Sequence, residues 1–286
     1  MFGNKTLERL EQMLDAANTG SFQESDYDET KLSKLEAKWK NFLETSVLSK
    51  ENLEKEKENI KSLVSDISHQ TKTPMANIKL YAALLREKAE SGFRSPDDAQ
   101  QSLKMADELC RQTEKLDFLI QSLTKMSRLE SNIVEVKPAC QPVLELVREA
   151  VFNTRPKAEE KGIDVRLCCE EAGNAVYDKK WTREALENVL DNAVKYSPEG
   201  SSVDIFVTEY EMYTGISVRD EGMGIREEEI PKIFGRFYRS RRVQQEDGVG
   251  IGLYLAREIL KKEKGYIKVR SKEGNGAEFT LFIPRN

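Results

Sequence analysis

Two apolar seams separated by a short breaker place the strongest limit on how this chain can fold. The first seam advances in steps of three and four residues, and it comprises Ile60, Val64, Ile67, Thr71, Pro74, Ile78, Tyr81 and Leu85. The second has the same spacing, and it comprises Leu103, Ala106, Leu109, Thr113, Leu116, Ile120, Leu123 and Ser127. Gly92 and Pro96 lie between the seams. This period is typical of helical bundles, so the segments predict an antiparallel helical hairpin.

A single hairpin buries each seam on one side only. A second copy of the hairpin would complete a four-helix bundle, and we therefore expect a homodimer. The polar segment before the hairpin, residues 1–49, reads as a helical linker with a break at "NTGSFQESDYDE". A partly disordered leader is an equally supported interpretation of that segment.

The period of the apolar residues changes after residue 136. Pro138 and Pro142 mark a boundary, and helical patterns then alternate with five strand-like runs, "IDVRLCC", "SVDIFVTEY", "TGISVRD", "GYIKVRS" and "AEFTLFIP". This mixture predicts a separate α/β domain of about 150 residues. The expected organisation is a linker at 1–49, a helical hairpin at 50–136 and an α/β domain at 137–286.

The composition narrows the range of partners. A formal net charge of -5 supplies no general basic field, so we expect neither nucleic acid nor a membrane surface as a partner. No apolar run approaches the roughly 20 residues of a membrane helix, and we expect the chain as given to be soluble. Four cysteines without a CxxC spacing, together with one histidine, disfavour a zinc site and favour a reducing compartment.

A polar face on one predicted helix suggests a binding site. In "ALENVLDNAVKYSPEG", Asn188, Asn192, Lys195 and Tyr196 follow the spacing i, i+4, i+7 and i+8, which brings them near one face of a helix. Asparagine is a poor residue for a helix interior, so two of them one turn apart beside a lysine indicate a polar site. A solvated helix edge is the competing interpretation of this motif alone.

Two glycine-containing motifs extend the candidate site. "VRDEGMGI" ends a predicted strand with Asp220, Gly222 and Gly224, a pattern that suits recognition of a flat polar group such as an adenine amino group. "DGVGIGLYLAREIL" carries glycines at positions 248, 250 and 252 into a helix, where backbone N–H groups suit phosphate oxygens. Its spacing differs from the dinucleotide fingerprint, which disfavours a Rossmann site.

Taken in order, the motifs resemble those of bacterial sensor histidine kinases. "ISHQTKTP" resembles the phosphoacceptor box and "ENVLDNAVKYSP" the asparagine box, and three further motifs, "DEGMGI", "IFGRFYRS" and "GVGIGL", follow in the family's order. The resemblance covers residues 50–286. It implies a dimeric phosphoacceptor hairpin and an ATP-binding α/β sandwich of the gyrase, heat-shock ATPase and histidine kinase superfamily.

The resemblance also implies roles for individual residues. His69 would attack the γ-phosphorus of ATP, and the phosphoryl group would pass to an aspartate of a response regulator. Asn192 would bind Mg²⁺, with Asn188 and Lys195 near the phosphates. Tyr196 and Asp220 would contact the base. The pocket and its lid would be formed by Gly222, Gly224, Gly248, Gly250 and Gly252, with Phe234, Phe237 and Arg239 anchoring the lid.

Three positions qualify the resemblance. The phosphoacceptor box usually has an acidic residue after the histidine, and Gln70 stands there instead. Thr73 matches the position that the family uses to orient water for dephosphorylating the regulator, which implies a phosphatase activity. ATP-hydrolysing members carry a glutamate four residues before the metal asparagine, and that position is Asn188. Glu187 is turned away from it by about 100° of helix.

Two alternatives stay open at the level of sequence. The chain could be a catalytically weak, nucleotide-binding dimeric scaffold, or an ATPase of the same superfamily. Sensor kinases usually carry membrane helices upstream, and residues 1–49 resemble a post-membrane linker. We therefore expect this chain to be the cytoplasmic part of a membrane-anchored sensor, without membrane contact of its own.

Overall fold

The computed structural model describes residues 31–92, 96–130, 136–169, 171–243 and 248–285. The chain divides into two compact units, Met1–Gln70 and Thr71–Asn286. The expected break at "NTGSFQESDYDE" lies outside the described residues. Helix α2 (Lys31–Ser91) is continuous through position 50, where the linker was expected to meet the hairpin, so that predicted boundary has no helix end to mark it.

The predicted hairpin is present in the second unit. The final turns of α2 lie beside the start of helix α3 (Pro96–Glu130), because Lys88 Nζ lies 3.2 Å from Asp98 Oδ1 and donates to Gln101 Oε1 at 2.5 Å. Pro74 is buried and lies inside α2, which continues through it. Proline removes one backbone donor from the helix, so the carbonyl of Gln70 loses its usual partner there.

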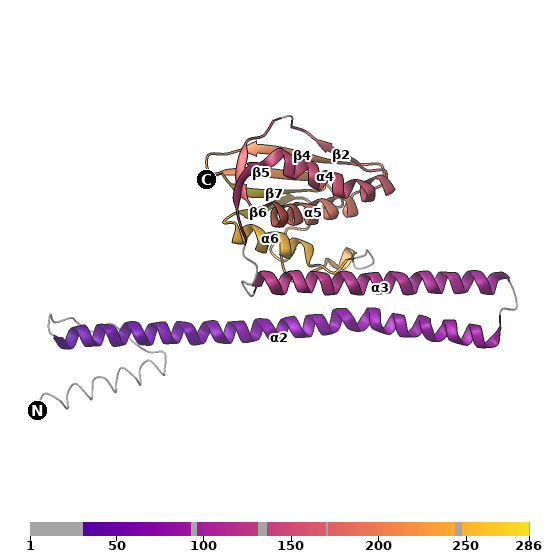
Figure 1. The fold of residues 1–286 in the computed structure, drawn as a ribbon, viewed down its shortest axis with the longest axis horizontal. Helices are drawn as coiled ribbons and strands as arrows, with labels where there is room; N and C mark the ends of the chain where they lie inside the picture. Colours follow the sequence, from indigo (N-terminus) through magenta and orange to yellow (C-terminus); the bar gives the residue numbers. More distant parts are fainter. Residues whose placement is uncertain (1–30, 93–95, 131–135, 170, 244–247, 286) are drawn as a thin grey trace, which may run out of the picture. The chain divides into compact units, whose positions relative to one another are not determined.

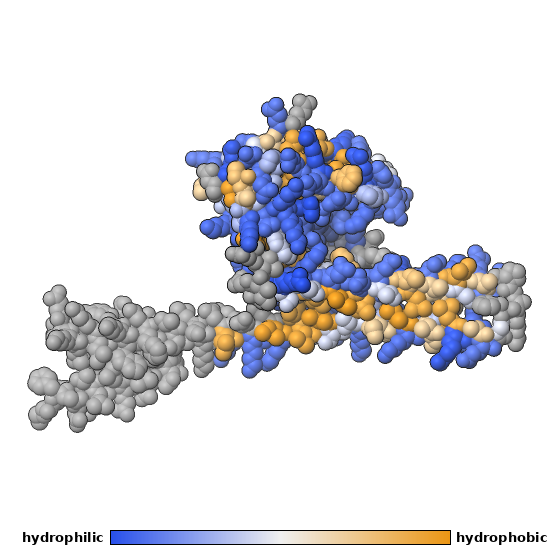
Figure 2. Space-filling view, viewed as in Figure 1, coloured by the Kyte–Doolittle hydropathy of each residue, from blue (hydrophilic) through white to orange (hydrophobic). Residues whose placement is uncertain are grey.

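Much of the second apolar seam is not buried within the chain. Leu103 and Ile120 are 66% and 53% exposed, whereas the buried apolar residues of α3 are Leu119, Met126 and Leu129. Apolar surface therefore runs along the hairpin, as the orange areas of Figure 2 show. Large apolar side chains left in contact with water on a bundle helix are typical of an interface with another chain.

The α/β domain is a two-layer sandwich. Its sheet has the strand order β2-β4-β5-β7-β6, and only the pair of β2 (Asp164–Leu167) with β4 (Ser202–Glu209) is parallel. The other strands are β5 (Tyr213–Asp220), β6 (Tyr266–Ser271) and β7 (Ala277–Pro284). All five predicted strand runs are therefore strands. Two short strands that were not predicted, β1 (Ala139–Pro142) and β3 (Asn174–Tyr177), form a separate antiparallel pair.

Three helices, α4 (Val143–Glu160), α5 (Lys179–Tyr196) and α6 (Gly252–Lys262), form the second layer (Figure 1). Helix α5 packs between the other two and against the sheet, and its buried residues include Leu186, Val189, Leu190 and Ala193. In the sheet, β5 and β7 contribute Ile216, Val218, Leu281 and Ile283 to the same core. The prediction of an α/β sandwich after a helical hairpin is confirmed.

Among the described residues, no helix has both the length and the apolar composition that are needed to span a membrane. All four cysteines are free thiols, and three of them are exposed.

Candidate functional site

A cavity of about 630 Å³ lies in the second unit, a volume typical of sites for small-molecule ligands. It is lined from α5, from the end of β5 and from the segments on both sides of the glycine loop at 248–252. Ten of the eleven residues that the sequence motifs assign to nucleotide binding share this lining. They are Asn188, Asn192, Lys195, Tyr196, Asp220, Gly224, Arg239, Gly248, Gly250 and Gly252.

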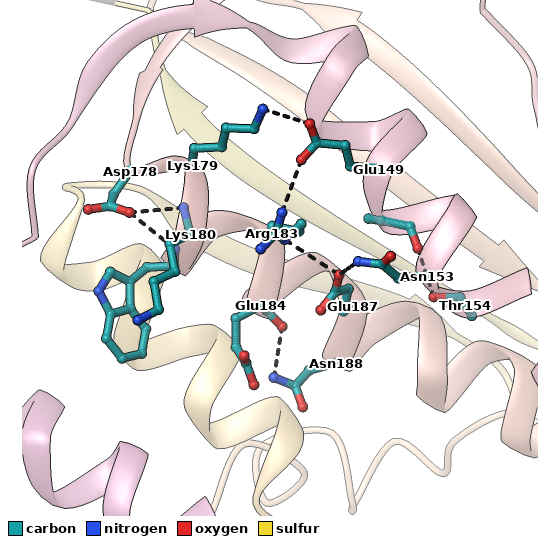
Figure 3. A network of polar contacts seen from close by, with 12 residues as sticks. Glu149, Asn153, Thr154, Asp178, Lys179, Lys180, Arg183, Glu184, Glu187 and Asn188 are labelled. Carbon is teal, nitrogen blue, oxygen red and sulfur yellow. Dashed lines mark hydrogen bonds and ion pairs between the residues drawn. The ribbon is translucent and has the colours of Figure 1, made fainter.

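Helix α5 presents the asparagine face to this cavity. The helix begins at the N-cap residue Asp178, whose Oδ1 accepts from the backbone N–H groups of Lys180 at 3.0 Å and Trp181 at 3.2 Å (Figure 3). An N-cap of this kind stabilises a helix by about 1 kcal/mol. Because the apolar face of α5 is buried in the core, its register is fixed and Asn188 and Asn192 line the cavity.

Asn188 is oriented by its own helix. Its Nδ2 donates to the backbone carbonyl of Glu184 at 2.8 Å, as Figure 3 shows. Its Oδ1 lies where a β-carbon on Gly252 would approach it to 2.9 Å, so the first turn of α6 comes close to this amide only because residue 252 is glycine. Lys195 lies about two turns further along α5, and its Nζ donates to Tyr196 Oη at 3.2 Å.

Asp220 is buried at the end of β5, with 7% of its surface exposed. Its Oδ1 accepts from the backbone N–H of Gly222 at 2.8 Å and of Ala277 at 3.1 Å. Burial raises the pKa of this carboxyl group, and the two backbone hydrogen bonds offset part of that shift. A carboxylate held in this way presents a fixed acceptor to a ligand in the cavity.

Gly222 is the one nucleotide-site prediction outside the cavity lining. A β-carbon at this position would lie 2.7 Å from the backbone carbonyl of Tyr196 and 2.8 Å from Asp220 Oδ1. Its place in the structure is therefore behind the site, where it allows the end of β5 to approach the end of α5. A side chain there would displace backbone.

The segment before the glycine loop contributes Arg239, whose Nη2 donates to the carbonyl of Val243 at 2.5 Å. Arg242 is exposed, and its Nη1 lies 2.7 Å from Glu273 Oε1. Phe234 packs edge-on against Phe279, with ring centroids 6.5 Å apart. Residues 244–247 of the predicted lid lie outside the described part of the chain.

Sequence reasoning missed the apolar part of the lining. The cavity is also bounded by Met223, Ile225, Ile233, Val249, Ile251, Ala277 and Phe279. The alternation within "AEFTLFIP" contains a signal for Phe279, because every second residue of that strand faces the helices. Arg111, Lys115 and Phe118 reach the same cavity from α3, and this long-range packing left no local signal in the sequence.

Glu187 does not belong to the cavity lining. It accepts from Asn153 Nδ2 at 2.6 Å and lies 3.6 Å from Arg183 Nε (Figure 3). Arg183 in turn donates to Glu149 on α4 at 3.1 Å. This carboxylate is therefore part of a polar network between α4 and α5.

The phosphoacceptor motif is on α2. His69 is an exposed helix residue and Gln70 is half-buried, both in the first unit. Thr73 is exposed and precedes the buried Pro74 in the second unit. The roles assigned to these residues, and those assigned to the cavity residues, remain predictions.

Two family models match the chain. Residues 59–132 match the His Kinase A (phospho-acceptor) domain. Residues 177–286 match the histidine kinase-, DNA gyrase B-, and HSP90-like ATPase domain. The first match contains His69, and the second contains α5 and both glycine motifs.

Curated relatives agree with the family models. Sensor protein KdpD of Clostridium acetobutylicum is 31% identical over 250 residues, which are 85% of this chain and 27% of that protein. Sensor protein SrrB of Staphylococcus aureus is 25% identical over 227 residues, which are 79% of this chain and 38% of that protein. The chain thus spans well under half the length of these relatives.

Solved structures share the fold. Histidine kinase AdeS of Acinetobacter baumannii superposes with a TM-score of 0.59 at 20% identity, covering 76% of this chain and 98% of that one. Histidine kinase ThkA, solved in complex with response regulator protein TrrA, gives 0.60 at 20% identity, covering 91% and 68%. With both domains matched in order, the chain belongs to the sensor histidine kinase family of two-component systems.

Proposed function

We propose that this chain is an ATP-dependent protein histidine kinase that phosphorylates His69 and passes the phosphoryl group to an aspartate of a response regulator. One observation carries the proposal. Residues from three separate motifs, Asn192, Asp220 and Gly250 among them, line a single cavity of nucleotide size. The alternative of a nucleotide-binding scaffold shares that cavity, so the transfer step is what the experiment must test.

The base would bind at the end of β5. Asp220 Oδ2, which accepts neither of the two backbone hydrogen bonds, would accept from the exocyclic amino group of adenine. Ile225 and Phe279 supply apolar surface for the ring faces. A buried carboxylate that hydrogen-bonds one amino group rejects bases with a carbonyl oxygen at that position, because two acceptors would then face each other.

The phosphates would lie between α5 and the glycine loop. Lys195 and Arg239 line this part of the cavity, and the N-terminus of α6 adds partial positive charge. Phosphoryl transfer depends on positioning and charge neutralisation more than on covalent help from the protein. These groups would hold the triphosphate and stabilise charge that develops on the leaving oxygen.

The cavity residues fit Mg²⁺. Among the described residues there is no cluster of three or more His, Cys, Asp or Glu side chains that could hold a metal ion unaided. An amide oxygen of Asn192 together with phosphate oxygens and water meets the preference of Mg²⁺ for oxygen ligands. When bound, the ion would neutralise charge on the phosphates.

In the transfer step, an unprotonated imidazole nitrogen of His69 forms a bond to the γ-phosphorus, and the bond from that phosphorus to the bridging oxygen breaks. ADP leaves with the electron pair of the broken bond. The remaining imidazole proton is released to water, because the amide of Gln70 has no basic site at neutral pH.

Hydrolysis is the less favoured reaction at this site. The position where ATP-hydrolysing relatives carry a glutamate is occupied by Asn188, which has no basic carboxylate. The neighbouring carboxylate of Glu187 is held by Asn153 and Arg183. A general base must reach the proton that it removes, directly or through one water.

The proposal is tested with γ-labelled ATP and Mg²⁺, comparing the wild-type chain with the His69→Ala variant. We expect an acid-labile, alkali-stable label on the wild type only, with equal nucleotide binding in both proteins. A receiver domain with its acceptor aspartate intact should then remove the label, and its Asp→Asn variant should not. Free phosphate release without a label on His69 would instead identify an ATPase.

A further inference from the structure

The last residue of α3, Glu130, connects two segments on either side of the glycine loop. Its Oε1 accepts from Tyr254 Oη at 2.6 Å and from Arg236 Nη2 at 2.6 Å. The guanidinium of Arg236 also lies over the ring of Tyr254, 5.1 Å from its centroid. We name these three residues, Glu130, Arg236 and Tyr254, the α3 latch. Arg236 precedes the loop at 248–252, and Tyr254 follows it.

The latch joins an exposed carboxylate, Glu130, to a buried tyrosine. Tyr254 is 6% exposed, and the neighbouring Leu129 is 1% exposed. Burial, followed by the bond to Glu130, raises the pKa of Tyr254 to about 12, so its hydroxyl remains a donor throughout the physiological range. Hydrogen bonds to a charged group contribute more than neutral ones, and the partial burial of the bond from Tyr254 reduces its screening by water.

Close backbone contacts continue from the latch to the cavity. Phe237, next to Arg236, has φ +57°, a conformation that residues other than glycine adopt only where their surroundings enforce it. Gly250 lies directly against this backbone, since a β-carbon on it would be 2.8 Å from Phe237 C and 2.6 Å from Tyr238 O. On the other side, Tyr254 is in the first turn of α6, two residues after Gly252.

We propose that Glu130 is a positioning residue, through which the end of α3 preorganises the glycine loop for nucleotide. The inference rests on the proposed function and adds a regulatory coupling to it. By linkage, nucleotide binding must strengthen the latch by the same factor by which the latch strengthens nucleotide binding. A change in conformation at the end of α3 would thus alter nucleotide affinity, and nucleotide binding would alter the conformation at the end of α3.

The test uses the intact chain, Mg²⁺ and the non-transferable analogue AMPPNP, with affinity measured by titration calorimetry. Glu130→Ala is expected to weaken binding about tenfold, a size common for coupled sites. Lys125→Ala is the matched control. Lys125 also connects α3 to the ATP-binding domain, through Glu184 Oε1 at 2.6 Å, but Glu184 belongs to α5 and not to the flanks of the glycine loop. The control is expected to change affinity less than twofold.

A second pair of variants tests whether Glu130 positions the glycine loop or only holds α3 against the ATP-binding domain. Glu130→Gln keeps an acceptor for Tyr254 and is expected to lose only about threefold in affinity, because the charge alone is removed. In the Arg236→Ala background, Glu130→Ala should have less effect than in the wild type, because the two residues act together. Equal losses in the Glu130→Ala and Lys125→Ala proteins, or full additivity with Arg236→Ala, would overturn the inference.

The outcomes also distinguish this inference from the proposed function. Unchanged AMPPNP affinity in Glu130→Ala, with normal labelling of His69 in the wild type, would contradict the role proposed for Glu130. The proposed kinase activity would still stand. A tenfold loss of affinity in a protein that never labels His69 would support the latch on a nucleotide-binding scaffold.

Discussion

A β-carbon on Gly252 would lie 2.9 Å from Oδ1 of Asn188, so the start of α6 and the amide on α5 fit together only without a side chain at position 252. Asn188 lines the cavity that we propose binds nucleotide. Gly252→Ala is therefore expected to turn the amide away and to weaken AMPPNP binding about fivefold, for a loss of about 1 kcal/mol from one displaced hydrogen-bonding group. Titration calorimetry measures the change in the affinity for AMPPNP.

The matched background for that variant is Asn188→Ala. If Gly252→Ala acts by displacing the Asn188 amide, it should change affinity little when the amide is already absent. An unchanged fivefold effect in this background would mean that the substitution disturbs the loop itself.

Asp220→Asn should separate nucleotide recognition from folding. An amide oxygen can still accept from Gly222 and Ala277, but the amide nitrogen would then meet the adenine amino group, donor against donor. We expect ATP affinity to fall more than tenfold while the free energy of unfolding at pH 8 stays equal or rises, because a buried charge is removed. Urea unfolding and AMPPNP titration test the two halves, and a parallel loss of stability would contradict this assignment.

Glu263 predicts a pH dependence of stability. It is 3% exposed, and burial raises its pKa to about 7, although it accepts from the backbone N–H of Asp178 at 2.9 Å and from Thr182 Oγ1 at 2.8 Å. Between pH 4.5 and 7 the folded chain keeps a proton that the unfolded chain releases. The free energy of unfolding therefore falls as pH rises through this window.

Glu263→Gln should abolish most of that fall. Relative to wild type, it is expected to gain about 1 to 2 kcal/mol at pH 8 and to lose this advantage at pH 5, as measured by urea unfolding. Glu211→Gln, at an exposed position, is the control and should leave the pH profile unchanged. Parallel profiles for wild type and Glu263→Gln would show that the carboxylate is not desolvated.

Gln70→Glu should accelerate autophosphorylation of His69. A carboxylate hydrogen-bonds the imidazole N–H more strongly than an amide does, and it can take up the proton that transfer releases. General-base catalysis commonly contributes a hundredfold or more, and we expect at least a tenfold rise in the labelling rate. AMPPNP affinity should not change. Equal or slower labelling would show that the glutamine is not limiting.

The exposed seam of α3 predicts a dimer interface. Ile120→Glu places a charge on a 53% exposed apolar position of this seam, and it should shift the chain toward monomer in sedimentation equilibrium. Phe152→Glu, at a 72% exposed position on α4, is the matched control and should keep the assembly unchanged. A wild-type chain that stays monomeric at high concentration would contradict the predicted dimer interface.

The sequence predicted the elements whose patterns are local. The hairpin, the five strands of the main sheet and α5 all follow from apolar periodicity, and the asparagine face follows from spacing along one helix. Strands β1 and β3 were missed because neither four-residue segment, "ACQP" or "NAVY", extends into a longer apolar run of the kind that contains β2 in "IDVRLCC". The ion pair of Arg242 with Glu273 could not be predicted because the two residues are 31 positions apart, and no local pattern joins them.

Contacts between the hairpin and the ATP-binding domain were equally inaccessible. Nothing in the neighbourhood of Glu130 distinguishes it from other acidic residues at the ends of helices. Its significance depends on Arg236 and Tyr254, more than 100 residues further along the chain, as the hydrogen-bond separations of 106 and 124 positions show. Long-range pairs of this kind are set by tertiary packing.

The strand order of the main sheet has a consequence for how the protein behaves in a crowded solution. Its two outer strands are β2, with only four residues, and β6, which carries the exposed Lys268 and Arg270. A short strand offers few unpaired backbone groups, and charged side chains on an outer strand oppose the addition of another chain. The sheet is therefore protected from growing edge to edge, and association is directed instead to the apolar helices of the hairpin.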